Sequence, residues 1–274
     1  MAKESVVFKN NAKSVAGGAA VVENGGMNRP SDRNTHARIA GRPGENARAM
    51  ALFRALWPLF AALFALGWLV RAAYPAWPAL SRPVVVLLFL ALAGGCGIFV
   101  ALSRAALSSW IKGAAGEEKV AQALAFLPAS WDVFHGVPPA GRTLWPARGD
   151  LDHVVLGPTG LFVVETKNWT GRIEIRDNAI FYEGGAPSRP PLDQVRRSAR
   201  ELAARLEAGG MRAVVHPVLC FAGTPPETGD EVGMGGVIVC GVDSLNRVLA
   251  SWNDDPVSES DRQKILAWLQ AQMG

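Results

Sequence analysis

The sequence has few cysteines, and none of them pairs with another at the spacing of a metal site or a redox motif. Cys96, Cys220 and Cys240 stand far apart and are odd in number. A zinc ribbon and a disulfide framework are therefore both disfavoured, because each needs cysteines in pairs. We expect a reducing compartment around the folded part of the chain.

Charged residues are missing from two long stretches in the first half of the chain. Residues 83–103 run for 21 residues without a charge, long enough for a helix to cross a hydrocarbon core of roughly 30 Å. Residues 55–70 add 16 uncharged residues, and they reach spanning length if residues 50–53 are included and Arg54 extends its side chain to the lipid surface. The two runs predict transmembrane helices at about 50–70 and 83–103. Two buried helices of a soluble protein are the alternative.

The short link between the two runs predicts a helical hairpin. Only about a dozen residues separate the runs, and basic residues precede the first run and follow the second, as Arg104 and Lys112. The positive-inside rule then places both chain ends in the cytoplasm and the protein in the inner (cytoplasmic) membrane. A cleaved signal peptide is disfavoured, because the first run starts far from the N-terminus and a second run follows. Small residues in both runs would allow close helix packing or a homo-oligomer.

Acidic residues are scarce in the N-terminal part and common afterwards. Residues 1–54 carry nine Lys/Arg and four Asp/Glu, whereas residues 112–252 carry 14 basic and 16 acidic residues. The sequence pI of about 9.2 is therefore no evidence for a basic nucleic-acid-binding domain. Residues 1–49 are rich in Gly, Asn, Ser, Arg and Pro, and they predict a disordered basic cytoplasmic arm.

From residue 113 onward, short apolar runs alternate with helical periodicity. We expect helices at 117–126, 192–208, 244–252 and 258–273, and strands at 131–137, 151–156, 161–167, 172–175, 179–182, 214–221 and 236–242. This order predicts a layered α/β domain over residues 113–252 and a C-terminal amphipathic helix within residues 253–274.

The informative feature is a predicted β-hairpin at residues 149–171. Strand alternation places Asp152 on one face of the first strand, and it places Glu165 and Lys167 on one face of the second. The two carboxylates would lie side by side, because neighbouring strands are about 4.8 Å apart. Such a pair is repulsive unless a cation lies between its members, and carboxylate oxygens are the ligands that Mg²⁺ (or Mn²⁺) prefers.

A lysine on the same face completes the requirements of phosphodiester hydrolysis. Lys167 can orient or activate a water, or stabilise the charge that develops on phosphorus. A structural ion pair between Glu165 and Lys167 is the alternative interpretation. His153 has the opposite strand parity and is expected to pack or to form hydrogen bonds away from the carboxylates.

The same region resembles the NERD (nuclease-related) domain, a branch of the PD-(D/E)xK, restriction-endonuclease-like superfamily. The resemblance covers roughly residues 113–250, and it rests on the blocks GE at 116–117, DLDHVV at 150–155, GPTGLFVVETKN at 157–168 and Gly171. It implies an α/β fold, a three-layer restriction-endonuclease-like core with a mixed central sheet. It also implies metal-dependent hydrolysis of nucleic acid, with DNA favoured over RNA.

The resemblance also assigns roles to single residues. By this resemblance Asp152 and Glu165 would bind the metal, Lys167 would be the lysine of the ExK motif, Glu117 would complete the metal shell, and Gln194 would support these residues or contact phosphate. Asp150 remains an alternative to Asp152, and Glu118 an alternative to Glu117.

Further candidates for nucleic-acid contact surround the predicted site. Arg196 and Arg197 lie on the helix after the hairpins and could bind backbone phosphates. Trp169 could stack on a base. A solvated helix face and an ordinary half-buried aromatic side chain are the respective alternatives.

These observations predict a membrane-anchored, divalent-metal-dependent nuclease that acts on nucleic acid at the cytoplasmic face. The first alternative is a non-catalytic module, tethered to the membrane, that binds nucleic acid or protein. The second is an envelope scaffold in which the membrane hairpin carries the function.

Overall fold

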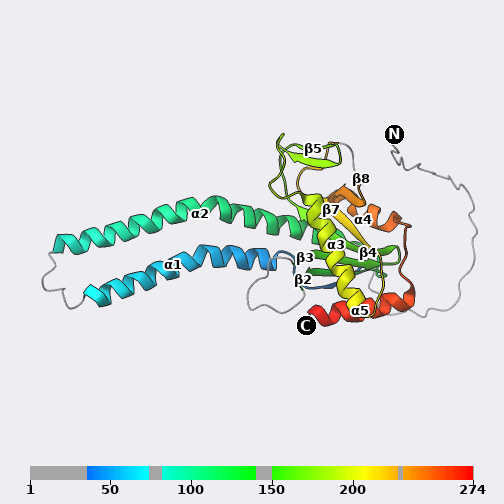
Figure 1. The fold of residues 1–274 in the computed structure, drawn as a ribbon, viewed down its shortest axis with the longest axis horizontal. Coiled ribbons are helices and arrows are strands. Elements are labelled where there is room, and N and C mark those ends of the chain that lie inside the picture. The colour runs from blue at the N-terminus through cyan, green and yellow to red at the C-terminus, as the bar shows by residue number, and fades with distance from the viewer. Residues whose placement is uncertain (1–35, 74–81, 140–149, 228–230, 274) are drawn as a thin grey trace, which may run out of the picture. The chain divides into compact units, whose positions relative to one another are not determined.

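The computed structural model describes residues 36–73, 82–139, 150–227 and 231–273, which all belong to one compact unit, Asn34–Gly274. In chain order its elements are β1 (Arg38–Ala40), α1 (Glu45–Ala73), α2 (Arg82–Leu124), β2 (Asp132–Val137), β3 (Leu151–Gly157), β4 (Gly160–Lys167), β5 (Ile173–Arg176), β6 (Ala179–Tyr182), α3 (Pro191–Ala208), β7 (Val215–Phe221), β8 (Glu231–Met234), β9 (Val237–Gly241), α4 (Val242–Ser251) and α5 (Glu259–Met273) (Figure 1).

The central sheet is mixed and has the strand order β1-β2-β3-β4-β7-β9-β8. β2, β3 and β4 form an antiparallel meander, and β7 and β9 continue the sheet in parallel with β4. β1 runs parallel to β2 at one edge, and β8 runs antiparallel to β9 at the other. β5 and β6 form a separate two-stranded hairpin.

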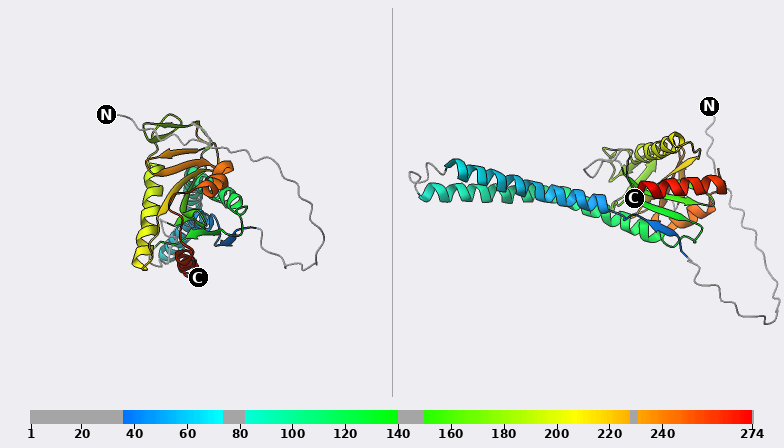
Figure 2. Two further views of the ribbon diagram at one scale, coloured as in Figure 1. Left: turned by 90° about the vertical axis from the view of Figure 1, so that its right-hand side faces the viewer. Right: turned by 90° about the horizontal axis from the view of Figure 1, so that it is seen from below.

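Helices cover both faces of this sheet, because the strands alternate between two apolar sides. Val155 and Phe162 face the layer of α2 and α4, which contributes Leu124. Val154 and Val163 face the layer of α3 and α5, and Figure 2 shows α3 on the side of the sheet opposite α4. This three-layer α/β arrangement fits a restriction-endonuclease-like core.

The predicted second apolar helix and the first helix of the α/β domain are one continuous element. α2 runs for 43 residues, Arg82–Leu124, and so joins the predicted helices at 83–103 and 117–126. The intervening stretch, residues 104–116, contains no proline and is rich in alanine, which has the highest helix propensity. The apolar part of α2 therefore connects to the folded domain without a flexible linker.

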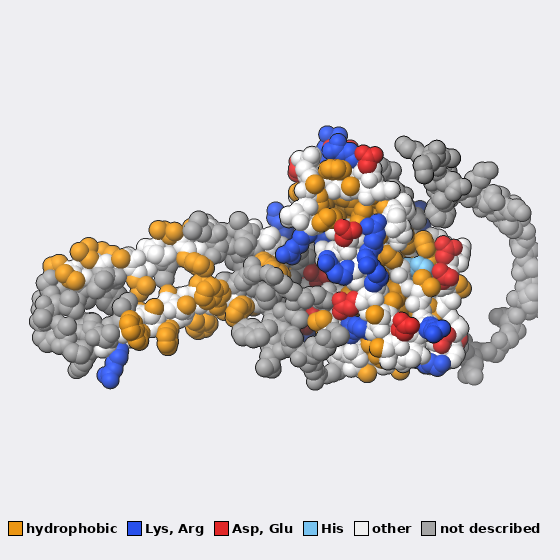
Figure 3. Space-filling model, in the orientation of Figure 1, with side chains coloured by type: hydrophobic (Ala, Val, Ile, Leu, Met, Phe, Trp, Pro, Cys, Tyr) orange, Lys and Arg blue, Asp and Glu red, His pale blue; other side chains and the backbone are white. Residues whose placement is uncertain are grey.

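In the part of the chain that the structure describes, one helix, α1, is long and apolar enough to cross a membrane. Its stretch Ala51–Trp68 has a mean hydropathy of 1.6 and is only 7% buried. Phe60 and Phe64 are among many large apolar side chains exposed there, and Figure 3 shows such side chains along both helices. Within the described residues α2 contributes a shorter apolar stretch, Leu90–Phe99, so a second span is not confirmed.

The N-terminal arm predicted at residues 1–49 ends earlier than expected. β1 pairs in register with β2, and α1 already begins at Glu45. Arg38 binds the buried carboxylate of Asp132 through two nitrogens, each 2.7 Å from an oxygen. A three-residue strand whose partner lies 94 positions away leaves no periodic signal, which is why the prediction was wrong here. Residues 1–35 lie outside the described part of the chain.

Candidate metal-binding site

The antiparallel pairing of β3 and β4 brings Asp152 and Glu165 together. His153 pairs with Val164 and Val154 with Val163, so the next position of this register places Asp152 opposite Glu165. Side chains directly opposite on antiparallel strands share one face of the sheet. Glu165 is buried, at 4% exposure, and Asp152 is half-buried. The structure therefore presents two acidic groups on the α3 side of neighbouring strands.

Glu165 lies at the centre of a polar network. Its Oε1 accepts hydrogen bonds from Lys167 Nζ at 2.7 Å and from Gln194 Nε2 at 2.5 Å. Lys167 Nζ also donates to Gln194 Oε1 at 3.0 Å. Gln194 projects from the first turns of α3, so this helix fixes the position of both charged side chains of β4.

Asp152 is held by the backbone of the partner strand. Its Oδ2 accepts a hydrogen bond from the Thr166 N–H at 2.8 Å. Burial raises the pKa of Asp152 well above its usual value, and the negative charges of Glu165 and Glu117 add to this effect. The Thr166 hydrogen bond and Lys167 lower the pKa, but they do not outweigh burial.

Glu117 reaches the same site from α2. Burial raises its pKa from 4.5 to about 7, and the charges of Glu165 and Asp150 also raise it. The Gly44 N–H donates to Glu117 Oε2 at 2.9 Å and, together with Lys167, acts in the opposite direction. The neighbouring acid, Glu118, forms an ion pair with Arg48 instead. Of the two candidates, Glu117 is therefore the one whose charge acts on Asp152 and Glu165.

The site contains more carboxyl groups than basic side chains. Asp152, Glu165 and Glu117 repel one another, and their partners include a single ammonium group, that of Lys167. Among the residues described, no group of three or more His, Cys, Asp or Glu side chains is arranged to hold a metal ion. Mg²⁺ is commonly bound by one or two carboxylates plus waters. The opposed pair, Asp152 and Glu165, fits that requirement in number and in donor type.

Comparison with known families identifies a domain in this part of the chain. Residues 112–222 match the family model of the nuclease-related domain, NERD. The match includes α2 from Lys112 onward, the β3–β4 hairpin and α3, which carry all the site residues described above. It indicates a nuclease-related function for this part of the chain.

A known relative covers only part of this sequence. The chain is 46% identical over 78 residues to an uncharacterised protein of Bacillus anthracis. That stretch is 27% of this chain and 34% of the relative, so the chain spans about a third of the relative's length. No solved structure matches the chain.

Behind the carboxylates, the NERD domain contains a buried pair of histidines. His153 points to the opposite face, as its strand parity predicts, and its Nδ1 lies 2.7 Å from Nδ1 of His135. Its Nε2 lies 3.2 Å from Thr166 Oγ1. Burial lowers the pKa of both rings, that of His135 to about 4, so both are neutral near pH 7. The role of His135 was missed, because only the pairing of β2 with β3 reveals it.

Trp169 packs inside the domain. Its ring centroid lies 4.8 Å from that of Tyr182 and 5.6 Å from that of Phe221. This arrangement favours the half-buried aromatic interpretation over a base-stacking role, because two neighbouring rings already occupy its surroundings. The buried thiols of Cys220 and Cys240 are neighbours on β7 and β9. Their hydrogen bond and burial raise the pKa of Cys220, which makes it a poor nucleophile.

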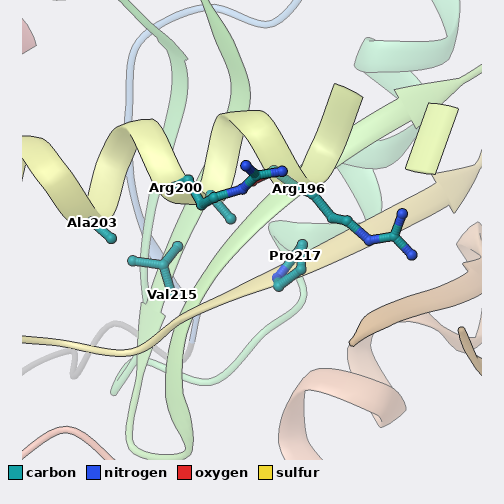
Figure 4. Close-up of a pocket in the computed structure, with 6 residues that line it drawn as sticks. Arg196, Arg200, Ala203, Val215 and Pro217 are labelled. Carbon is teal, nitrogen blue, oxygen red and sulfur yellow. The ribbon is translucent and has the colours of Figure 1, made fainter. Parts of the chain in front are cut away.

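The arginines of α3 differ from one another in their surroundings. Arg196 donates to the backbone oxygens of Gly235 and Met234, each at 3.3 Å, and to Asp193 at 3.1 Å. Arg197 is exposed. A pocket of about 200 Å³ lies between α3 and β7 (Figure 4) and is lined by Arg196, Ala199, Arg200, Ala203, Val215 and Pro217. This pocket contains none of the carboxylates, so it is separate from the candidate metal site.

Proposed function

We propose that the protein is a membrane-anchored, divalent-metal-dependent nuclease that hydrolyses phosphodiester bonds of nucleic acid, with DNA the favoured substrate. One observation carries this proposal: Asp152 and Glu165 face each other on adjacent strands, and Lys167 lies 2.7 Å from Glu165. The NERD match supports a nuclease-related function. The mutual repulsion of these carboxyl groups in their ionised forms supports a role for a bound cation.

In this proposal Asp152 and Glu165 hold Mg²⁺ or Mn²⁺, and Glu117 completes the site from α2. When bound, the ion would polarise a phosphoryl oxygen and lower the pKa of a coordinated water. Gln194 keeps the Glu165 carboxylate in one orientation through its 2.5 Å hydrogen bond. This orientation matters because a ligand held in advance loses little entropy when it binds its ion.

Lys167 is the residue that acts on the substrate. In the structure its ammonium group is bonded to Glu165 and Gln194, and its side chain is largely shielded from solvent. A positive charge in such surroundings interacts strongly with developing negative charge, because little water screens it. We assign Lys167 to the stabilisation of the phosphorane-like charge and to the orientation of the attacking water.

In this proposal the exposed face of α3 binds the phosphate backbone of the nucleic acid. Arg197 and Arg200 are exposed on the helix that also carries Gln194. Phosphate contacts of this kind position a nucleic acid without reading its sequence. Arg196 is already bonded to backbone oxygens of β8 and the β8–β9 turn, and Arg200 donates to the Arg196 carbonyl oxygen at 3.3 Å. Arg197 is therefore the better candidate.

The membrane anchor is assigned to the apolar parts of α1 and α2. α1 supplies one candidate span, and Trp57 of α1 contacts Phe99 of α2 edge-on at 6.5 Å between ring centroids. We infer that both helices cross the inner membrane as a hairpin, with both chain ends and the NERD domain in the cytoplasm. The charge bias of the flanking sequences supports this topology.

The direct test is a cleavage assay of the full chain in detergent micelles. Labelled single-stranded DNA, duplex DNA and RNA are incubated with Mg²⁺, with Mn²⁺ or with EDTA. We expect metal-dependent cleavage that Glu165→Ala abolishes. Glu207→Ala, which removes an exposed carboxylate near the end of α3, serves as the control and should cleave normally. Cleavage that survives both EDTA and Glu165→Ala would contradict the proposal.

A second candidate is a metal-independent binding module. The observation in its favour is that Lys167 and Gln194 both donate hydrogen bonds to Glu165 Oε1, so protein groups already bind this oxygen. The two functions differ in thermal unfolding, because a ligand that binds only the folded state raises the melting temperature. A nuclease of the proposed kind melts at a higher temperature in Mn²⁺, whereas a binding module without a metal site does not.

A further inference from the structure

Residues 36–48 lie outside the NERD match, yet they pack on the domain that carries the candidate site, and Gly44 contacts Glu117. β1 adds an edge strand to the central sheet next to β2. The backbone N–H groups of Ala37 and Arg38 donate to the carbonyl oxygens of Leu127 and Trp131, at 2.8 and 3.0 Å. Backbone hydrogen bonds from Ala37 and Arg38 therefore join this stretch to the domain.

A buried charge cluster fixes the same segment in place. Besides its two contacts with Arg38, Asp132 accepts a hydrogen bond from Arg262 of α5 at 3.2 Å. The carboxylate of Asp132 is buried whereas the side chain of Arg38 is half-exposed, and a buried carboxylate needs such partners to compensate its charge. Gly41 lies so close to His135 that an added Cβ would sit 2.1 Å from the His135 carbonyl oxygen. The path of the chain from β1 to α1 is thus determined by the domain core.

This path ends at Gly44, which is buried against the helix that carries Glu117. Gly44 has φ +69, a conformation that favours glycine. An added Cβ there would lie 3.0 Å from the Ala114 Cβ. In this close position the Gly44 N–H reaches Glu117 Oε2 at 2.9 Å. The neighbouring ion pair between Arg48 and Glu118 holds the first turn of α1 against the same part of α2.

The same turn of α2 is also bound from the side of β4. Asn168, the residue after Lys167, donates from Nδ2 to the Lys112 carbonyl oxygen at 2.7 Å. Gly116 lies against it, since a Cβ at Gly116 would sit 2.5 Å from the Asn168 Cβ. The start of α1 and the end of β4 therefore both contact the part of α2 that presents Glu117.

We propose that Gly44 is a positioning residue for Glu117, and that residues 36–48 belong to the metal-binding domain. The α1–α2 hairpin is then an insertion within this domain rather than an anchor joined to its N-terminal end. A displacement of α1 relative to α2 would move the third carboxylate of the site. The part of this proposal that concerns metal rests on the function proposed above.

The first experiment compares Gly44→Ala with Gly210→Ala in the full chain in detergent. Gly210 has a similar φ of +75, but no atom lies within 4 Å of its added Cβ, so both variants carry the same backbone strain. Mn²⁺ affinity is measured by calorimetry without nucleic acid. We expect Gly44→Ala to weaken binding about tenfold, the lower end of the usual effect of residues that orient metal ligands, and Gly210→Ala to leave it unchanged.

A double variant separates positioning from general damage. In a Glu117→Gln background the carboxylate that Gly44 orients is gone, so Gly44→Ala should cause no further loss of Mn²⁺ affinity. An equal loss in both backgrounds would overturn the positioning role. Equal affinities of Gly44→Ala and Gly210→Ala in the presence of Glu117 would overturn it as well.

Hydrogen exchange tests the contact without altering Gly44 and without metal. Glu117→Ala should speed the exchange of the Gly44 amide about tenfold, because that N–H loses a charged acceptor. Glu118→Ala removes only the Arg48 ion pair and should leave this amide unchanged. No change in Glu117→Ala would overturn the proposal, even if the wild type binds metal. Conversely, a wild type that binds no metal but shows the expected exchange would overturn the proposed function alone.

Discussion

The two faces of the β3–β4 hairpin use polar side chains in opposite ways. On the α3 side, Asp152 and Glu165 are opposed carboxylates, and Lys167 is their ammonium partner. On the α2 side, His153 and Thr166 belong to a hydrogen-bonded network that includes His135. The residues of the two sets alternate along the same strands, so the local backbone is common to both.

The two faces differ in how burial changes the pKa values of their side chains. Burial makes both histidines neutral by lowering their pKa values, so their side needs no ion. On the other face, burial and mutual repulsion raise the pKa of Asp152. A fold that keeps such a repulsive set of side chains loses stability unless a ligand compensates for it. This difference favours a structural role for the histidine face and is consistent with the chemistry proposed for the carboxylate face.

Removal of the charge of Lys167 is the change expected to have the largest effect, and it tests the role of the carboxylate face. Lys167→Met keeps most of the side-chain volume and leaves Glu165 without its ammonium partner. We expect cleavage to fall on the order of a hundredfold, the usual effect of losing one charge-stabilising group, whereas Mn²⁺ binding persists. Single-turnover kinetics and calorimetry measure the two effects. Unaltered cleavage would show that Lys167 has a structural role and not a catalytic one.

A substitution on the histidine face should lower the stability of the protein and leave its cleavage rate unchanged. His135→Leu leaves His153 Nδ1 buried without a partner, which costs about 1–3 kcal/mol of unfolding free energy. Urea denaturation measures the loss, and the cleavage rate per folded molecule should stay unchanged. A large loss of rate in protein that remains folded would show that this network takes part in the reaction.

The charge of Glu117 predicts a pH dependence of stability in the absence of metal. Its folded-state pKa of about 7 lies above the ordinary value of 4.5, so the folded state binds more protons than the unfolded state between these values. The contribution of Glu117 to the free energy of unfolding therefore decreases as pH rises from about 4.5 to about 7, whereas His135 and His153, whose pKa values are lowered by burial, contribute in the opposite direction. Thermal melts of the wild type and of Glu117→Gln across this window measure the contribution of Glu117 as the difference between the two slopes. A slope that is the same in Glu117→Gln would assign the effect to other groups.

The smallest expected effect concerns nucleic-acid affinity. Arg197→Ala removes an exposed charge, so binding should weaken slightly and to the same extent for every sequence, and the salt dependence of binding should decrease by about one ion. Fluorescence anisotropy at several salt concentrations measures both. Glu207→Ala is a suitable control on the same helix, and a variant indistinguishable from it would show that Arg197 is only a solvated residue.

Much of the carboxylate face could be predicted from local sequence. Strand alternation and a short turn suffice to place Asp152 beside Glu165, because both properties depend on residues 149–171 alone. The resemblance to the NERD domain added Glu117 and Gln194, whose contacts span many residues. The choice of Glu117 over Glu118 depended on helix packing, and the structure resolves it through the partner of each side chain, Gly44 and Arg48.

What the sequence did not reveal depends on distant contacts or on backbone groups. Gly44 binds Glu117 from 73 positions away through an N–H that almost every residue possesses, so no side-chain pattern marks it. β1 is too short to show the alternating pattern of a strand. The His135–His153 contact can be found only from the register of β2 against β3. The continuity of α2 was also missed, because the change from apolar to polar sequence suggested two separate helices.

The most direct test of the central claim is calorimetric titration of the full chain with Mn²⁺, without nucleic acid, for the wild type, Asp152→Asn and Glu165→Gln. The account predicts saturable binding in the wild type and loss of that binding in each variant, because the two opposed carboxylates share one ion. Full binding in either folded variant would contradict it.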